Sequence, residues 1–259
     1  ANKGAYSYAW MIIFAVIAAI MVLIGLYHIR MLPSNQIPST TKKTTSEVGR
    51  ELVAVIANFF TKKHIFYYIC FIILYRLAEG FIMKIAPLFL RASREVGGLG
   101  LSLKEIGTLN GVFGSAAFVL GSLLAGIYVS KFGLKRTLFT LCCIFNLPFV
   151  AYTFLAVTQP TNVYLIGTCI TMEYFGYGFG FVGLTLFMMQ QIAPGKHQMS
   201  HYAFASGIMN LGVMLPGMVS GYFSDLLGYR NFFIYVLIAT IPAFLITYFI
   251  PFTYDDSKK

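Results

Sequence analysis

Long apolar stretches are the feature that most constrains how this chain can fold. Seven of them stand out, at residues 6–27, 64–90, 103–130, 137–157, 163–189, 199–223 and 231–250. An α-helix rises about 1.5 Å per residue, so roughly 20 apolar residues cross the hydrocarbon core of a bilayer. Charged residues make up only 11% of the chain, against about 25% in soluble domains. The sequence therefore predicts an all-α membrane protein with seven transmembrane helices.

The basic residues between these stretches predict how the chain is oriented. The connections on one side contain twelve of them: Arg30, Lys42, Lys43, Arg50, Lys62, Lys63, Lys131, Lys135, Arg136, Lys196, Lys258 and Lys259. The other side has five: Lys3, Arg91, Arg94, Lys104 and Arg230. Because lysine and arginine are enriched in cytoplasmic loops, we expect the larger set in the cytoplasm and the N-terminal end outside. Topology thus accounts for the net charge of +10, and nucleic acid is not an expected partner.

The cysteines and the first residues of the chain give fewer indications. All four cysteines, Cys70, Cys142, Cys143 and Cys169, lie in apolar stretches without the spacing of a metal site or an obvious disulfide. We expect packing roles for them, and no metal and no cofactor. No cleavable signal sequence is recognisable, and since the chain does not begin with Met we expect an excerpt or a processed product.

The polar linker at residues 30–63 contains a predicted amphipathic helix. Thr44 and Glu47 have the spacing of a capping box. Apolar residues then recur on one helical face: Val48, Leu52, Val55, Ile56, Phe59 and Phe60. Two interpretations remain open. The helix lies in the membrane interface, with Arg50, Lys62 and Lys63 near anionic headgroups, or it packs on the cytosolic face of the protein itself.

Two charged residues interrupt the second apolar stretch, at residues 74–81. Arg76 and Glu79 lie near the middle of that stretch, where each ionisable group costs roughly 2.5 to 3.5 kcal/mol on insertion scales. Such residues face a bundle interior or a wet cavity, so a part in transport is the first hypothesis. Because they are three residues apart, they also share a helix face, and a purely structural ion pair is the alternative.

A third intramembrane charge, Glu173, lies near the centre of the fifth stretch. It shares a helical stripe with Gly176, Tyr177 and Gly180. No basic residue lies in the same stretch, so the carboxyl must be protonated, face water, or find a partner on another helix, such as Arg76 or Lys84.

Glycines at four-residue spacing predict close helix packing. Small residues allow two helix backbones to approach within a membrane. The run at residues 176–183 superficially resembles a phosphate-binding loop, but it lies inside an apolar stretch rather than between a strand and a helix. We interpret it as a packing surface or a hinge. The spaced pairs are Gly107/Gly111, Gly176/Gly180 and Gly217/Gly221.

One short connection resembles a cytoplasmic motif of the major facilitator superfamily. In that motif a small residue, an acid, a base, a glycine and two more bases follow at fixed spacing. The corresponding residues are Gly126, Ser130, Lys131, Gly133, Lys135 and Arg136. Ser130 stands where the motif usually has Asp, so the resemblance implies a gating loop that lacks its usual acidic residue.

A closer resemblance is to AmpG-type muropeptide permeases, in the group that also contains acetyl-CoA transporters. It rests on residues 74–81, 172–180, 198–206 and 221–233 and covers about residues 64–250. Ser200 and His201 depart from it, since the family tends to have Thr-Gln there.

This resemblance implies half of a transporter. Residues 1–29 correspond to the last helix of the N-terminal half, residues 30–63 to a cytoplasmic linker, and residues 64–259 to the C-terminal six-helix bundle. An N-terminal half of the same transporter is then an expected partner. The resemblance also puts Arg76, Glu79, Lys84 and Glu173 on helices seven and ten, which line the central cavity in this superfamily.

The resulting hypothesis is proton-coupled import of a sugar-containing solute, such as an anhydromuropeptide, across a bacterial inner membrane by alternating access. Glu79 and Glu173 are the candidates for proton coupling, and Arg76 tunes them or binds a substrate carboxylate. The candidates for the substrate cavity are Lys84, Tyr75, Tyr174, Tyr177 and Asn110. Another small anionic solute or sugar is the alternative substrate.

Two other classes of protein fit the sequence less well. A seven-helix receptor shares the expected number of spans and the outside start, but the last stretch has no Lys for a retinal Schiff base and no Asn-Pro-x-x-Tyr sequence. An intramembrane enzyme would need catalytic pairs within a span, and none is spaced for this, so we do not expect an enzyme.

Overall fold

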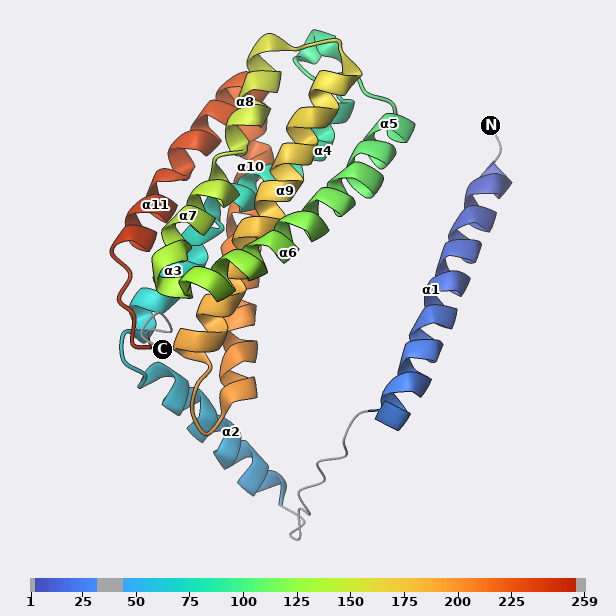
Figure 1. Cartoon of the computed structure of the whole chain (residues 1–259). Coiled ribbons are helices and arrows are strands. Elements are labelled where there is room, and N and C mark those ends of the chain that lie inside the picture. The colour runs from blue at the N-terminus through green and yellow to red at the C-terminus, as the bar shows by residue number, and fades with distance from the viewer. Residues whose placement is uncertain (1–2, 32–43, 255–259) are drawn as a thin grey trace. The chain divides into compact units, whose positions relative to one another are not determined.

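The computed structural model describes residues 3–31 and 44–254, and the described residues form helices and no strands. The elements are α1 (Lys3–Met31), α2 (Thr45–Phe60), α3 (Ile65–Tyr75), α4 (Leu77–Arg91), η1 (Arg94–Val96), α5 (Leu103–Thr108), η2 (Leu109–Gly114), α6 (Ser115–Phe132), α7 (Leu134–Asn146), α8 (Phe149–Thr158), α9 (Val163–Phe187), η3 (Met188–Ile192), α10 (Gln198–Ala239) and α11 (Ile241–Tyr248) (Figure 1). Lys42, Lys43, Lys258 and Lys259 lie outside the described residues. The all-α prediction is confirmed.

The chain divides into two compact units, Ala1–Val48 and Gly49–Lys259. The first contains α1, a 29-residue helix. Its apolar side chains, among them Trp10, Phe14 and Leu23, are exposed within the unit. A helix of this length that is apolar on all sides suits a bilayer or a helical partner.

Five helical segments of the described residues are long and apolar enough to cross a membrane. They are Ser7–Met31, Ile65–Arg91, Leu103–Phe132, Leu134–Thr158 and Gln198–Tyr248. The last one joins the predicted sixth and seventh spans, although Gly228 interrupts it with φ 69° and ψ 160°. The predicted fifth span forms a 25-residue helix, α9, but its glycines, tyrosines and Glu173 make it less apolar. The number seven therefore stays a prediction.

Helix α9 packs between α6 and α7 in the second unit (Figure 1). Glycines make the close approach possible. A Cβ added to Gly178 would collide with the carbonyl oxygen of Phe118 on α6, and one added to Gly180 would collide with the Phe145 side chain on α7. Gly176 likewise lies against Pro148. The predicted close packing at Gly176 and Gly180 is confirmed.

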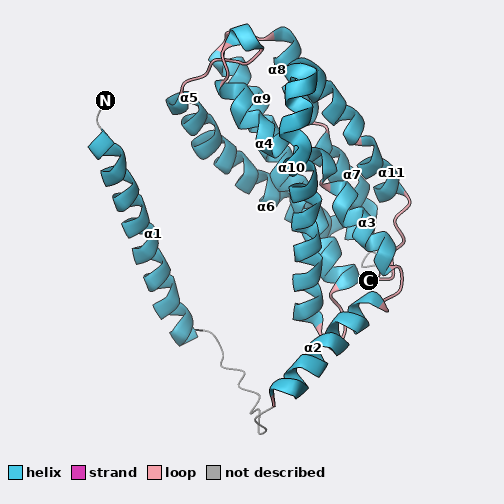
Figure 2. Cartoon of the chain, turned by 180° about the vertical axis from the view of Figure 1, so that it is seen from behind, coloured by secondary structure: helices cyan, strands magenta, loops and turns pink. Residues whose placement is uncertain are grey.

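A second close contact joins α4 to α10, which run side by side (Figure 2). Gly80 on α4 leaves no room for a Cβ beside Pro216, and a Cβ on Gly217 would lie 3.4 Å from the Gly80 carbonyl oxygen. The other predicted glycine contacts are wrong for this unit, because nothing lies within 4 Å of a Cβ at Gly107, Gly111 or Gly221.

At each end of the second unit, hydrogen bonds hold two connections between helices together. At one end, Arg94 donates hydrogen bonds to the Gln159 and Pro160 carbonyls, both at 2.8 Å. At the other end, the Lys62 ammonium donates to the carbonyls of Ile192 and Pro194 at 2.5 and 2.6 Å. Partial burial lowers the pKa of the Lys62 ammonium. Connections predicted on the same side of the membrane therefore lie at the same end of the unit.

Helix α2 shows features of both interpretations of the linker. The backbone N–H of Thr44 donates to Glu47 Oε2 at 2.8 Å, one of the two bonds of a capping box. Val55 and Phe59 are buried, so the C-terminal part packs on the protein. Leu52 and Phe60, however, are exposed, which leaves an apolar face free for a membrane interface.

A substitution at Gly178 tests the packing of α9. We expect Gly178→Ala to lower the stability of the full-length protein by about 1 to 3 kcal/mol, because the methyl group meets backbone that cannot move freely. Gly207→Ala is the matched control, since nothing lies within 4 Å of a Cβ there, and alanine favours helix. Thermal unfolding in detergent measures both. Equal melting temperatures for the two variants would contradict the close contact.

Cysteine labelling tests the orientation. On a background without the four native cysteines, a cysteine at Lys135 should react with a membrane-impermeant maleimide only from the cytoplasm, and one at Thr161 only from outside. Both positions are exposed. Reaction of Thr161→Cys from the cytoplasmic side would reverse the predicted topology.

Candidate functional site

Arg76 lies at a break between two helices. Helix α3 ends at Tyr75 and α4 begins at Leu77, while Arg76 has φ −103° and ψ 5°. The Gly80 N–H donates to the Arg76 carbonyl at 3.0 Å, so α4 starts anew here. Glu79 falls in the first turn of α4, where the helix dipole favours a negative charge.

Arg76 and Glu79 form a buried two-pronged ion pair. Arg76 Nε lies 2.6 Å from Glu79 Oε2, and Arg76 Nη2 lies 2.5 Å from Glu79 Oε1. The two residues are only 4% and 5% exposed. The guanidinium carbon also lies 5.4 Å from the centre of the Phe181 ring. Both charges are therefore compensated, as a pair this deep requires.

A small cavity of about 190 Å³ opens beside this pair. Residues of α4, η2, α8 and α9 line it: Glu79, Ile82, Met83, Ala86, Pro87, Leu90, Asn110, Tyr152, Glu173, Tyr174 and Tyr177. The structure thus brings together five residues predicted from the sequence, Glu79, Asn110, Glu173, Tyr174 and Tyr177.

Glu173 differs from Glu79 in its surroundings. Its carboxyl is half-buried and makes no hydrogen bond or ion pair with any residue that the structure describes. Of the predicted possibilities, pairing with Arg76 or Lys84 is wrong, since Glu79 occupies Arg76. A protonated carboxyl, or one facing water in the cavity, remains. Two carboxyls of one cavity therefore have opposite environments.

Asn110 lies in η2, a π-helical turn between α5 and α6. Its Oδ1 atom is buried and accepts no hydrogen bond from the described residues. π-Helical turns occur frequently at functional sites, and buried polar atoms nearly always have partners. Gly114, in the same turn, gives room to the Tyr174 ring, which would lie 3.0 Å from a Cβ there.

Two predicted cavity residues lie elsewhere. Tyr75 is fully buried and donates its hydroxyl hydrogen to the Gly180 carbonyl at 2.9 Å, so it packs in the core against Phe145. Lys84 is exposed, and its side chain passes close to Gly217 on α10. Lys84 lies on α4, which lines the cavity, but it is not among the lining residues, and Tyr75 lies on α3, which contributes no lining residue.

Six of the residues that line the cavity were not predicted from the sequence: Ile82, Met83, Ala86, Pro87, Leu90 and Tyr152. Tyr152 lies in an apolar stretch with no charged residue to single it out. Met83 and Pro87 follow Glu79 at spacings of four and eight, which put them on the same helical face. This helical spacing from Glu79 is the sequence signal by which Met83 and Pro87 could have been predicted.

The predicted gating loop forms the turn between α6 and α7. Gly133 has φ 79°, a conformation that favours glycine. The Ser130 hydroxyl donates to the Ile127 carbonyl at 2.9 Å, so this serine is engaged within its own helix. The loop borders a pocket of about 590 Å³ lined by Gly126, Ser130, Lys131, Gly133, Arg136 and others. Lys135 is not among the residues that line the pocket.

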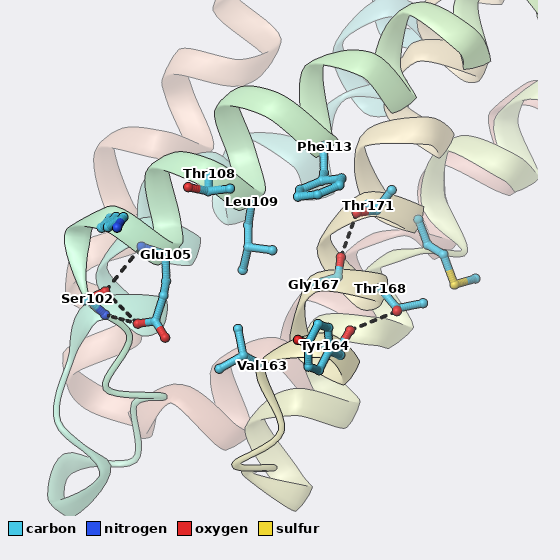
Figure 3. A pocket seen from close by; sticks show the side chains of 12 residues that line it. Ser102, Glu105, Thr108, Leu109, Phe113, Val163, Tyr164, Gly167, Thr168 and Thr171 are labelled. Atoms are coloured by element: carbon cyan, nitrogen blue, oxygen red, sulfur yellow. Dashed lines mark hydrogen bonds between the residues drawn. The ribbon is translucent and has the colours of Figure 1, made fainter.

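A larger groove of about 800 Å³ lies between α5–η2 and α9 (Figure 3). Several of its polar groups bond within their own helices. Glu105 accepts from the Ser102 hydroxyl at 2.6 Å, and the Thr171 hydroxyl donates to the Gly167 carbonyl at 2.7 Å. Neither Glu79 nor Glu173 lines this groove. The small cavity, which both of them line, is therefore the candidate site although it is the smaller of the two.

The two carboxyls should differ in their effect on stability. Glu79→Gln leaves Arg76 without its counter-charge, and breaking a buried pair in this way costs about 3 to 5 kcal/mol. Glu173→Gln removes no ion pair, so we expect a change within about 0.5 kcal/mol. Melting temperatures of the two purified variants measure the difference. If both fall equally, Glu173 has a partner of its own.

Comparison with known proteins places the chain in a family. The model of the Major Facilitator Superfamily matches residues 4–194. The anhydromuropeptide permease of Escherichia coli (strain K12) is 23% identical over 209 residues, which are 81% of this chain and 41% of that relative. Putative transporter AmpG 1 of Rickettsia bellii is 25% identical over 228 residues, covering 88% of this chain and 53% of the relative. Putative transporter AmpG 2 of Rickettsia prowazekii is 27% identical over 204 residues, covering 77% and 47%.

These relatives are longer than the chain, which spans about two fifths to half of their length. The family match, in contrast, covers most of this chain. Together with the apolar helices it shows an integral, multi-pass membrane protein of a transporter family rather than an enzyme. The chain belongs to the Major Facilitator Superfamily.

Proposed function

We propose that this chain is the C-terminal half, with the preceding helix, of a proton-coupled transporter in a bacterial inner membrane. The transporter imports a sugar-containing solute of the anhydromuropeptide type by alternating access. Residues 1–29 are the last helix of the N-terminal half, residues 30–63 the cytoplasmic linker, and residues 64–259 the C-terminal bundle. The named relatives support the substrate class.

The lengths of the helices support seven crossings. Helix α9 has 25 residues and is about 37 Å long at 1.5 Å per residue, enough for a bilayer of about 30 Å. The segment Gln198–Tyr248 has 51 residues, more than one crossing needs. Its interruption at Gly228 divides it into two helices of suitable length.

The observation that carries the coupling mechanism is the contrast between the two carboxyls of the cavity. Glu173 has no hydrogen-bond or ion-pair partner among the described residues, so it can take a proton without breaking any contact that they make. Glu79 shares its charge with Arg76, and a proton on Glu79 would release the guanidinium. Protonation of Glu79 or Glu173 from one side of the membrane would change the attraction between these carboxyls and Arg76. The changed attraction would favour either the inward-open or the outward-open state of the transporter.

Arg76 acts on the carboxyls in this mechanism. Its guanidinium is engaged by Glu79 and by the Phe181 ring, and Arg76 is absent from the lining of the cavity. Of the two roles considered for it, tuning of Glu79 fits these contacts better than binding of a substrate carboxylate. Tyr174 and Tyr177 remain candidates for stacking on a sugar ring, while Tyr75 and Lys84 do not.

Uptake by vesicles tests the mechanism. The full-length transporter and its Glu79→Gln and Glu173→Gln variants are reconstituted, and uptake of an anhydromuropeptide is driven by a proton gradient. A coupling carboxyl that cannot titrate should abolish accumulation against a gradient, while exchange of internal for external solute continues. Glu105→Gln is the matched control, because this carboxyl caps α5 and lies outside the small cavity.

Each outcome has a distinct meaning. Wild-type protein that takes up no anhydromuropeptide would contradict the proposed substrate, and the same assay with other sugars and small anions would identify the alternative. Stable variants that still accumulate solute with unchanged pH dependence would show that neither carboxyl carries the proton. A receptor would show no uptake at all, although the family match favours a transporter.

A further inference from the structure

We propose that the small cavity selects a hydrogen-bond donor group of the transported solute and rejects a carboxylate, and that Asn110 determines this specificity. The donor is a hydroxyl, an amide N–H or an ammonium group. This inference rests on the proposed function, because it assumes that the cavity lies on the transport path. It adds the chemistry of recognition, which neither the family nor the proton-coupling carboxyls define.

The side-chain amide oxygen of Asn110, Oδ1, supplies the first argument. It is buried, and no described residue donates a hydrogen bond to it. A buried acceptor without a donor is rare in folded proteins and calls for an explanation. Asn110 lies in the π-helical turn η2 and lines the cavity together with Glu173. An oxygen in this place is satisfied when a solute brings its own donor.

The charges around the cavity supply the second argument. The ionisable lining groups are the carboxyls Glu79 and Glu173 and three tyrosine hydroxyls, and no Lys, Arg or His of the described chain is among the lining residues. The nearest cation, Arg76, is held in two hydrogen bonds by Glu79. The walls that the described part of this chain provides therefore offer carboxyl and amide oxygens as acceptors but no free positive charge, so a donor group finds partners here and a carboxylate finds no counter-charge.

The volume supplies the third argument. The cavity measures about 190 Å³, whereas one water molecule takes about 30 Å³ of liquid. There is room for about six water-sized groups, so at most one small part of a muropeptide-type solute fits inside. The Tyr152, Tyr174 and Tyr177 rings at its wall can enclose such a group while the rest of the solute lies outside.

Two substitutions at Asn110 separate recognition from folding. Asn110→Leu keeps the size of the side chain but removes the acceptor, and Asn110→Asp keeps an acceptor. In the full-length transporter, exchange of a labelled anhydromuropeptide gives the apparent affinity, and thermal unfolding without solute gives the stability. Thr108→Val is the control, because it changes the larger groove on the neighbouring face.

We expect Asn110→Leu to weaken the apparent affinity about three- to tenfold, the size of one lost hydrogen bond, with an unchanged or higher melting temperature. Asn110→Asp and Thr108→Val should stay within about twofold of wild type. A lower melting temperature with unchanged affinity for Asn110→Leu would make Asn110 structural and overturn the inference. If wild type exchanges no anhydromuropeptide, the proposed function itself fails.

Competition by two sugars tests the selection of charge. Glucosamine and glucuronate have the same ring, but one has an ammonium group and the other a carboxylate. At equal concentrations we expect glucosamine to inhibit exchange more strongly. Equal effects, including no effect of either, or stronger inhibition by glucuronate would contradict selection by an acceptor-rich cavity.

Discussion

The close approach of α9 to its neighbours is the constraint on which the rest of the second unit depends. In a bilayer, apolar side chains gain little by leaving lipid, so helices associate through tight packing. Gly178 allows α9 to touch the α6 backbone, and Gly176 and Gly180 allow contact with the α7–α8 region. Because Glu173 and Tyr177 lie on the same helix, the packing of the glycines also fixes where the cavity receives its polar side chains.

The break at Arg76 fixes the position of Glu79 on α4, as the glycines fix the positions of Glu173 and Tyr177 on α9. A continuous helix would leave Glu79 in a mid-helix turn, but the break puts it in the first turn of α4, where free N–H groups favour a carboxylate. Arg76 at the break can then reach both oxygens of Glu79. The Glu79 carboxyl is thus held by the charge of Arg76 and by the helix dipole, while the Glu173 carboxyl faces the cavity.

Sequence reasoning located most of the helices and the charged centre of the site for a clear physical reason. Apolar length and the high cost of buried charge are properties of single segments, so Arg76, Glu79 and Glu173 could be found without a structure. Which way a side chain points depends on neighbouring helices. Tyr75 therefore turned out to pack in the core, and Gly107 and Gly111 have no neighbour in this unit. The break at Arg76 has no glycine or proline to signal it.

The distribution of charge links orientation to recognition. Basic side chains are concentrated at the ends of the helices, such as Lys62 at the carbonyls of Ile192 and Pro194, where topology requires them. Near the middle, the cavity has two carboxyls, and the adjacent guanidinium is neutralised by one of them. On the proposed transport path, a group that enters from either side leaves the basic ends and meets carboxyl and amide oxygens at depth. This arrangement supports the proposal of a neutral or cationic donor at the centre, with any anionic part of the same solute near the ends.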